Sequence, residues 1–313
     1  MRITALAGGI GAGKFLRGLV REVEESDVTA IVNTGDDISM YGLHVSPDLD
    51  SVTYWLGDAF DRERGWGRRD ETFRATEELR RFDPDLAWFN LGDLDLATHL
   101  FRTNLLASGT GLSEATARVA ARFGIRARLL PMTEDPVTTR IDVAAEGREL
   151  DLHFQEYWVR RGARDEVKSV RYEGATSARP GPGVLEAIAE ADAVVICPSN
   201  PVASIGPILA VPGVRQAVER RRERVVGISG IVRGAPLAGM ADRLMPVAGV
   251  EVTAAGAAEF YRDLLGAWVI DEGDRSLAAR IGSTGIRVAV TDTIMTDDAA
   301  ARALARVALD AIA

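Results

Sequence analysis

The first 32 residues place an apolar strand, a glycine-rich loop, an amphipathic helix and a second apolar strand in succession. A helix that connects two strands in this way covers one face of a sheet and leaves the strands parallel. Similar apolar segments and helical patterns alternate again near the end of the chain. The alternation predicts an α/β fold, a Rossmann-like doubly wound sheet that is mainly parallel. The expected strands are Ile3–Ala7, Val28–Val32, Ala193–Cys197, Val225–Ile228, Ala267–Ile270 and Val288–Val290, and the expected first and last helices are Phe15–Val23 and Asp297–Ile312.

The middle of the chain follows a different pattern. Residues from about 50 to 125 are mostly helical in pattern, and two β-type runs follow, Thr138–Val143 and Val167–Tyr172. A Pro/Gly turn at Ala178–Gly183 returns the chain to the alternation of strands and helices. We therefore expect a Rossmann-like core at residues 1–50 and 175–313, interrupted at 51–174 by an inserted, mostly helical subdomain that forms one side of the site.

Composition excludes several classes of protein. The 46 acidic residues outnumber the 37 Lys and Arg, and the resulting net charge of -9 argues against a nucleic-acid partner. No apolar run approaches the roughly 20 residues that span a bilayer, so no membrane partner is expected. One cysteine, Cys197, excludes a disulfide framework and is typical of a reducing cytoplasm, where we expect the protein.

The loop after the first strand is rich in glycine and ends in a lysine. Glycines let a backbone approach an anion closely, and the following helix points free N–H groups at it, so a phosphate site is expected there. The alternative is a tight structural turn. The residues expected to hold phosphate are Gly8, Gly9, Gly11, Gly13 and Lys14.

Two departures narrow the kind of phosphate site. Phe15 stands where a P-loop needs Ser or Thr to hold magnesium, so a P-loop NTPase is not expected. The second strand runs into Asn33, where a dinucleotide-binding dehydrogenase has an acid for the ribose. A site for another phosphorylated nucleotide remains.

Carboxylates gather in the loops that follow the second strand. Asp36 and Asp37 follow the strand directly, and Asp48 and Asp50 come shortly after. Because the latter pair is two residues apart, one can face the site while the other caps a helix. A carboxylate beside a phosphate requires a cation between them, and Mg²⁺ takes one or two carboxylates plus phosphate oxygens. For either Asp, the N-cap role is as ordinary as that of a ligand.

Three further segments offer polar or aromatic groups. Asn90–Asp95 combines an amide with two carboxylates that are also ordinary helix caps, and His99 follows. His153–Trp158 places aromatics beside polar groups, which is typical of a site for a flat heteroaromatic ligand and also of a mixed surface helix. After a buried strand, Ser199 and Asn200 offer hydrogen bonds to a nucleotide at the edge of the sheet.

Taken in order, these segments resemble the 2-phospho-L-lactate transferase family of deazaflavin coenzyme (coenzyme F-420) biosynthesis. The resemblance extends from Gly8 to Asp297, nearly the whole chain. The matching stretches are GGIGAGKFLRGL, VNTGDD, SPDLDSVTYWL, RGWG, LGDLDLATHL, LLPMTEDPVTT, HFQEYWV, PSNPVASIGPIL and MTD.

The resemblance implies an enzyme that transfers a phosphoenolpyruvyl or 2-phospho-L-lactyl group. The donor is a guanosine-diphosphate carrier, the acceptor is the primary alcohol of the deazaflavin precursor, and GMP leaves. It also implies Mg²⁺ as cofactor and a homodimer. Asp50 is then the acidic catalytic residue near the metal and the deazaflavin and a metal ligand. Asp36 and Asp37 are expected as further metal ligands, and Asn90 and His153 on the deazaflavin side.

Two positions depart from the family pattern. Leu94 stands where relatives usually have Arg, so another arginine, Arg102 or Arg140, is expected to compensate, and Asn90 stands where some relatives carry Lys. The chief alternative function is a non-catalytic regulator with the same core that binds nucleotide sugars. Between the two donors, the Arg-rich composition, typical of a high-GC bacterium, favours the enolpyruvyl carrier.

Overall fold

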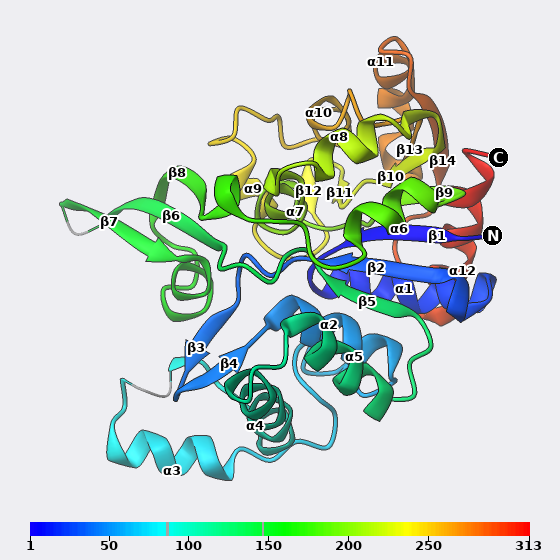
Figure 1. The fold of residues 1–313 in the computed structure, drawn as a ribbon. Coiled ribbons are helices and arrows are strands. Elements are labelled where there is room, and N and C mark those ends of the chain that lie inside the picture. Colours follow the sequence, from blue (N-terminus) through cyan, green and yellow to red (C-terminus); the bar gives the residue numbers. More distant parts are fainter. Residues whose placement is uncertain (86–87, 146) are drawn as a thin grey trace.

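In a computed structural model that describes residues 1–85, 88–145 and 147–313, seven parallel strands form a central sheet (Figure 1). The order across the sheet is β14-β13-β10-β9-β1-β2-β5, and every neighbouring pair is parallel. These strands are β1 (Ile3–Ala7), β2 (Val28–Val32), β5 (Arg128–Pro131), β9 (Ala193–Ile196), β10 (Val225–Ile228), β13 (Ala267–Asp271) and β14 (Arg287–Thr291). The arrangement confirms the predicted α/β, Rossmann-like fold.

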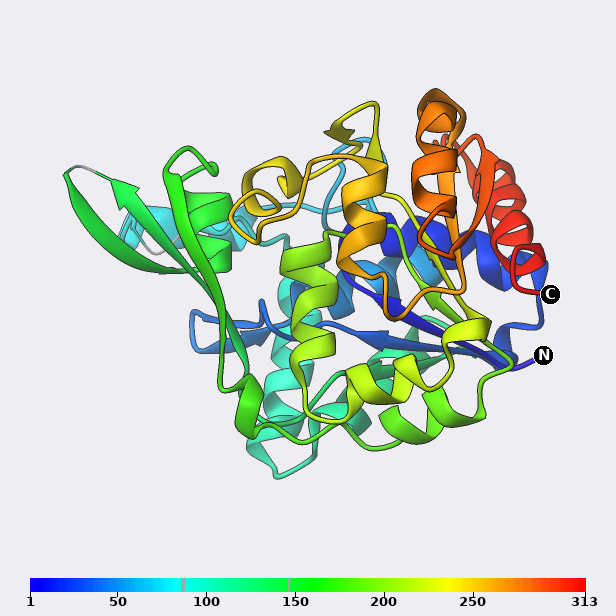
Figure 2. The same cartoon turned by 90° about the horizontal axis from the view of Figure 1, so that it is seen from above.

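Helices cover both faces of this sheet (Figures 1 and 2). On one face lie α1 (Gly9–Glu22), α2 (Pro47–Leu56), α5 (Leu112–Arg122) and α12 (Asp298–Asp310). On the other face lie α6 (Val184–Glu190), α7 (Gly206–Ala210), α8 (Val214–Glu219), α10 (Ala254–Phe260) and α11 (Ala278–Gly282), with α9 (Ala241–Leu244) beside them. Within the described ranges, none of the helices has both the length and the apolar character needed to cross a membrane.

Two apolar cores follow from the pleat of the strands. Successive side chains of a strand point to opposite faces. Leu6 and Ile31 therefore join the core under α6 and α8, whereas Ala5 and Ala30 join the core under α1 and α12. Because both faces are buried, β1 and β2 are buried along their whole length and mostly apolar, rather than alternating between apolar and polar residues.

The remaining elements lie at one side of the sheet. The hairpin β3 (Ile38–Met40) and β4 (Leu43–Val45) adjoins α3 (Arg74–Phe82) and α4 (Asp93–Ala107), while β6 (Thr138–Ala145), β7 (Arg148–His153) and β8 (Glu166–Glu173) form an antiparallel sheet. The β6–β7 hairpin extends away from the body of the molecule (Figure 2). A short hairpin of β11 (Ile231–Val232) and β12 (Ala235–Pro236) follows β10.

The predicted central strands agree with the structure to within one residue at each end. Two details differ. The first helix begins at Gly9, six residues before the predicted start, because the glycine loop itself forms its first turns. Strand β5 lies within the segment 51–174, which we expected to be an insertion, yet it pairs with β2 in the central sheet. The division of the chain into core and insertion stays a prediction.

Gly227 offers a test of core packing. A Cβ atom built there would lie 2.3 Å from the Trp268 ring, and Trp268 is buried. We expect Gly227→Ala to lower the free energy of unfolding by about 1–3 kcal/mol, since the ring must move within a packed core. Urea denaturation measures the change. Gly282→Ala is the matched control, because no atom lies near its Cβ position, and we expect it to be neutral or slightly stabilising. Equal effects of both substitutions would contradict this account of the packing.

Candidate active site

The carboxyl ends of β1 and β9 form the point where the order of strands reverses, since β2 follows β1 on one side and β10 follows β9 on the other. Connections leave such neighbours in opposite directions and open a crevice where α/β proteins bind ligands. Here the loop and helix after β1 meet the loop after β9. A Cβ atom at Gly11 would lie 2.2 Å from the Pro198 carbonyl oxygen, and the Ser199 hydroxyl donates to the Gly8 carbonyl at 2.8 Å.

A cavity of about 680 Å³ opens at this point. It collects most of the residues that the sequence predicted for the site, although they come from distant parts of the chain. Those that line it are Gly8, Gly9, Gly11, Lys14, Asp36, Asn90, Ser199 and Asn200. The predicted residues Gly13, Asp37, Asp50 and His153 are not part of this lining.

Two buried carboxylates face the cavity, Asp36 from the loop after β2 and Asp48 from the first turn of α2. One amide lies between them: Asn33 Nδ2 donates to Asp48 at 2.9 Å and to Asp36 at 3.3 Å. Gln155 donates to the second Asp36 oxygen at 2.7 Å, and the Gly9 backbone bonds to Asp48.

The electrostatics of this pair are unfavourable to two negative charges. Burial raises the pKa of Asp36 well above its usual value, and repulsion from Asp48 raises it further. Burial also raises the pKa of Asp48, to about 7. A divalent cation relieves such repulsion. Within the described ranges no three acidic, His or Cys side chains form a ready-made metal site, so a cation here requires additional oxygens from a ligand.

The positive groups of the cavity come from α1. Its first residues, from Gly9 to Gly11, line the cavity at the end of the helix where N–H groups are free and the dipole is positive. Lys14 lies one turn further, with its Nζ 5.8 Å from the centre of the Trp55 ring. These groups and the two carboxylates together suit a phosphate held beside a cation.

Aromatic side chains form another part of the lining. Trp66 and Phe89 come from the segments on either side of α3, and Phe154 and Trp158 follow β7. Trp66 and Trp158 are each 38% exposed, so both rings are open to an incoming molecule. Flat rings bind such side chains by stacking, which suits an aromatic ligand at this end of the cavity.

The predicted residues outside the lining hold other parts of the structure. His153 Nδ1 accepts from the Gln155 N–H, so its Nε2 carries the proton and donates to the Asp37 backbone carbonyl at 3.0 Å. The Asp37 carboxylate accepts from His44 and Ser46. Gly13 packs against Trp55, and Asp50 forms an ion pair with Arg102.

Asp93, in the Asn90–Asp95 segment, and Glu71 form a reciprocal pair of helix caps. Asp93 accepts from the backbone N–H groups of Arg74 and Ala75 at the start of α3, while Glu71 accepts from those of Leu94 and Asp95 at the start of α4. The capping role that the sequence left open for Asp93 is therefore the one observed. Leu94 is 38% exposed and does not line the cavity. Neither Arg102 nor Arg140, the expected replacements for an arginine at position 94, lines the cavity.

Sequence reasoning missed several cavity residues. The sequence offers Asp48 only as one of two alternatives with Asp50, it contains Trp66 and Gln155 only as parts of longer motifs, and Phe89 is in none of the motifs. The spacing of residues along α2 gives one usable signal. Pro47, Asp48 and Ser51 of α2 line the cavity, whereas Asp50 is turned away from it, as expected for residues on different faces of one helix.

The raised pKa of Asp48 predicts a dependence of stability on pH. Between the unfolded value of about 3.9 and the folded value of about 7, the folded state binds more protons, so stability falls as pH rises through this window. We expect Asp48→Asn to remove about 2–4 kcal/mol of this fall, measured by urea denaturation at several pH values without divalent cations. Asp263→Asn, at an exposed position, is the control and keeps the wild-type slope. An unchanged slope in Asp48→Asn would contradict the assignment.

The chain is similar to known proteins over nearly its whole length. The profile of the family described as 2-phospho-L-lactate transferase CofD matches residues 3–307. A phosphoenolpyruvate transferase of Streptomyces griseus is 48% identical over 311 residues, which cover 99% of this chain and 98% of that protein. One of Streptomyces coelicolor is 48% identical over 99% of this chain and 97% of its own length, and one of Mycolicibacterium smegmatis is 41% identical over 99% and 98%.

Solved structures show the same fold at lower sequence identity. A crystal structure of a member of the UPF0052 family from Bacillus halodurans superposes with a TM-score of 0.62 at 15% identity, covering 97% of this chain and 98% of that one. A second structure from Bacillus halodurans gives 0.61 at 17% identity, covering 98% of each chain. The profile match and the full-length relatives together show that this chain is a transferase of the 2-phospho-L-lactate transferase (CofD) family of coenzyme F-420 biosynthesis.

Proposed function

We propose that the chain transfers a phosphoenolpyruvyl group from a guanosine-diphosphate carrier to the primary alcohol of the deazaflavin precursor and releases GMP. The observation that carries this proposal is one cavity lined by the start of α1, by two buried carboxylates and by aromatic rings. These three surfaces match the diphosphate, the cation and the flat ring system that the reaction brings together.

The donor side of the proposed reaction lies at α1. The free N–H groups of Gly9 to Gly11 and the Lys14 ammonium bind phosphate oxygens and orient the diphosphate for attack. Ser199 lies beside them with its hydroxyl tied to Gly8. Asn200 caps the following helical turn through its Oδ1, which leaves its Nδ2 as the group for the nucleotide.

We assign Mg²⁺ to Asp36 and Asp48. The sequence prediction of Asp50 and Asp37 is revised in this proposal, because Asp50 is paired with Arg102 and Asp37 is bonded to His44 and Ser46. When bound, the cation neutralises charge on the diphosphate as the bond to GMP breaks. Asn33 and Gln155 hold the two carboxylates in place with three hydrogen bonds.

The acceptor side lies among the aromatic residues. Trp66 and Trp158 offer faces for the deazaflavin rings. Asn90, which follows Phe89 in the sequence, also lines the cavity. Stacking fixes the plane of the rings, and the amide of Asn90 supplies a hydrogen bond where some relatives carry Lys. His153 does not line the cavity, so we assign it to the orientation of the loop that contains Asp36.

The enolpyruvyl donor is favoured over the lactyl donor by the relatives. Several proteins between 40% and 49% identical to this chain over nearly its full length bear the name phosphoenolpyruvate transferase. The Arg-rich composition points the same way. Homodimer formation and a cytoplasmic location remain predictions from the sequence.

Product analysis tests this proposal. We expect the protein, given deazaflavin alcohol, Mg²⁺ and an equal mixture of the two donors, to form mainly the unsaturated product with GMP. The two products differ by two hydrogens, so one mass spectrum distinguishes them.

Lys14→Met is expected to raise the KM for the donor by roughly 10–100-fold, since a charge-assisted contact to phosphate is lost. Lys168→Met, at the other lysine of the chain, on β8 and outside the cavity lining, is the matched control and is expected to leave the KM for the donor unchanged.

Other outcomes have clear meanings. A mainly saturated product would overturn the choice of donor and leave the transferase assignment intact. No product, together with binding of UDP-sugars and no binding of guanine nucleotides, would replace the transferase by the nucleotide-sugar-binding regulator. Turnover that persists after complete removal of divalent cations would contradict the role assigned to Asp36 and Asp48.

A further inference from the structure

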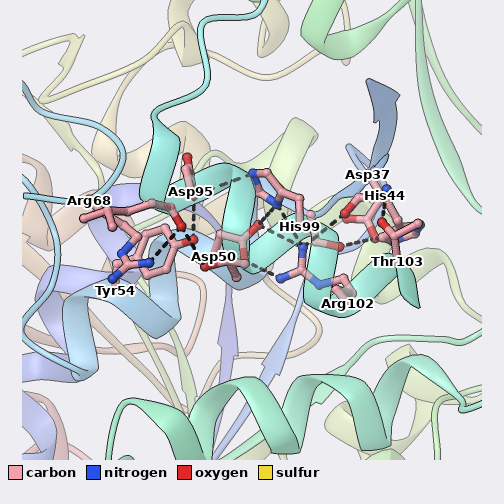
Figure 3. A network of polar contacts seen from close by, with 12 residues as sticks. Asp37, His44, Asp50, Tyr54, Arg68, Asp95, His99, Arg102 and Thr103 are labelled. Carbon is pink, nitrogen blue, oxygen red and sulfur yellow. Dashed lines mark hydrogen bonds and ion pairs between the residues drawn. The ribbon is translucent and has the colours of Figure 1, made fainter. Parts of the chain in front are cut away.

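A buried ion pair between Asp50 and Arg102 joins α2 to α4 (Figure 3). Asp50 is 4% exposed and Arg102 is 1% exposed. Both guanidinium NH₂ groups of Arg102 donate to the Asp50 carboxylate, one of them at 3.1 Å, so the contact is bidentate. A bidentate pair fixes both the distance between two side chains and their relative orientation.

Further contacts extend this pair into a ladder between the two helices. Asp50 and Tyr54 lie one turn apart on α2, and Asp95, His99 and Arg102 follow one face of α4. Tyr54 donates to Asp95 at 2.5 Å, and His99 lies 3.6 Å from both Asp50 and Asp95. We call these five residues the Arg102 cluster (Figure 3). None of them lines the cavity.

Helix α4 also contacts His44, which is bonded to the loop that contains Asp36. Arg102 donates to the His44 carbonyl at 3.4 Å, and Thr103 accepts from the His44 N–H at 2.8 Å. The His44 ring bonds in turn to the Asp37 carboxylate at 2.9 Å, next to Asp36. Arg102 is therefore linked to α2, which presents Asp48, and to the loop that presents Asp36.

Helix geometry makes the link to Asp48 direct. Residues two apart on an α-helix point about 200° apart, so Asp50 faces α4 while Asp48 faces the cavity. A rotation or shift of α2 relative to α4 would move Asp48 by a similar amount. The ion pair is formed two residues, about half a helical turn, from Asp48 and opposes such a movement.

Stability alone does not explain a buried ion pair. Removing two charges from water costs about as much as their attraction returns, and well-packed apolar side chains are often at least as stabilising. A pair of apolar side chains does not fix the relative orientation of the two helices. A fork of two hydrogen bonds holds one arrangement of the helices, whereas apolar contacts permit small slides.

We propose that Arg102 is a positioning residue that, through Asp50 and His44, sets the separation of the two cavity carboxylates Asp36 and Asp48. The inference rests on the proposed function, in which these carboxylates hold a divalent cation. Asp50 then acts as the partner of Arg102, not as a ligand of the metal.

The test uses the full chain with Mn²⁺ alone as the probe, followed by electron paramagnetic resonance in the absence of substrates. The informative variant is Asp50→Leu/Arg102→Met, which removes both charges and fills the space with apolar side chains. Arg102→Lys keeps the charge and removes the fork. Asp48→Asn is the ligand-loss reference, and Ile188→Ala, in the core under α6, is the control for lost stability without contact to the cluster.

We expect the double variant to unfold at a temperature near that of the wild type, to bind Mn²⁺ at least 10-fold more weakly, and to lose at least 10-fold in kcat with a smaller change in KM. Arg102→Lys is expected to show a smaller loss of the same kind, about 3-fold or more in Mn²⁺ affinity. Ile188→Ala is expected to lower the unfolding temperature and leave Mn²⁺ affinity unchanged.

Wild-type Mn²⁺ affinity in the double variant would overturn the proposal and leave the pair a purely structural contact. If the double variant does not fold, Arg102→Lys is the deciding variant, and wild-type Mn²⁺ affinity in Arg102→Lys would also overturn the proposal. A further variant, Asp50→Asn, tests whether Asp50 binds the metal directly. If it abolishes Mn²⁺ binding as fully as Asp48→Asn does, while Arg102→Lys has no effect on Mn²⁺ affinity, Asp50 is a direct ligand and the proposal is overturned. Because Mn²⁺ binding needs no substrate, these outcomes are separate from failure of the transferase assay.

Discussion

The reversal of strand order between β1 and β9 is the constraint on which the rest of the site depends. Neighbouring connections that leave in opposite directions cannot fill the space between them, so a crevice opens at the carboxyl ends of these strands. Close approach of the two loops is possible because Gly11 has no side chain to meet the Pro198 carbonyl. The same reversal brings the free N–H groups of α1 and the Ser199 loop together in the lining of the cavity.

In this crevice the fold holds two carboxylates whose simultaneous negative charge is unfavourable. Two buried carboxylates share one amide donor at the positive end of a helix, and burial raises the pKa of both. In the proposed function, a cation with phosphate oxygens would complete the arrangement, because it would neutralise the carboxylates and the phosphate together. Perturbed pKa values of this kind are common at functional sites.

The structure separates the groups that face the ligand from the groups that hold them. Asp36 and Asp48 line the cavity, while Asp37 and Asp50, their near neighbours in sequence, point to His44 and Arg102. Each acidic motif therefore supplies one residue to the cavity and one to its support. Similarly, Glu71 and Asp93 hold the starts of α3 and α4, between which Phe89 and Asn90 reach the cavity.

The sequence by itself determined the fold class, nearly all strands of the central sheet, the glycine loop and the family, because these depend on local apolar patterns and on ordered motifs. It did not reveal β5, a short strand whose place at the edge of the sheet depends on pairing with distant β2. Nor could it decide between Asp48 and Asp50, since spacing shows only that they face apart. Only the tertiary structure decided that question, because the packing of α4 against α2 determines which face of the helix is covered and which is open to the ligand.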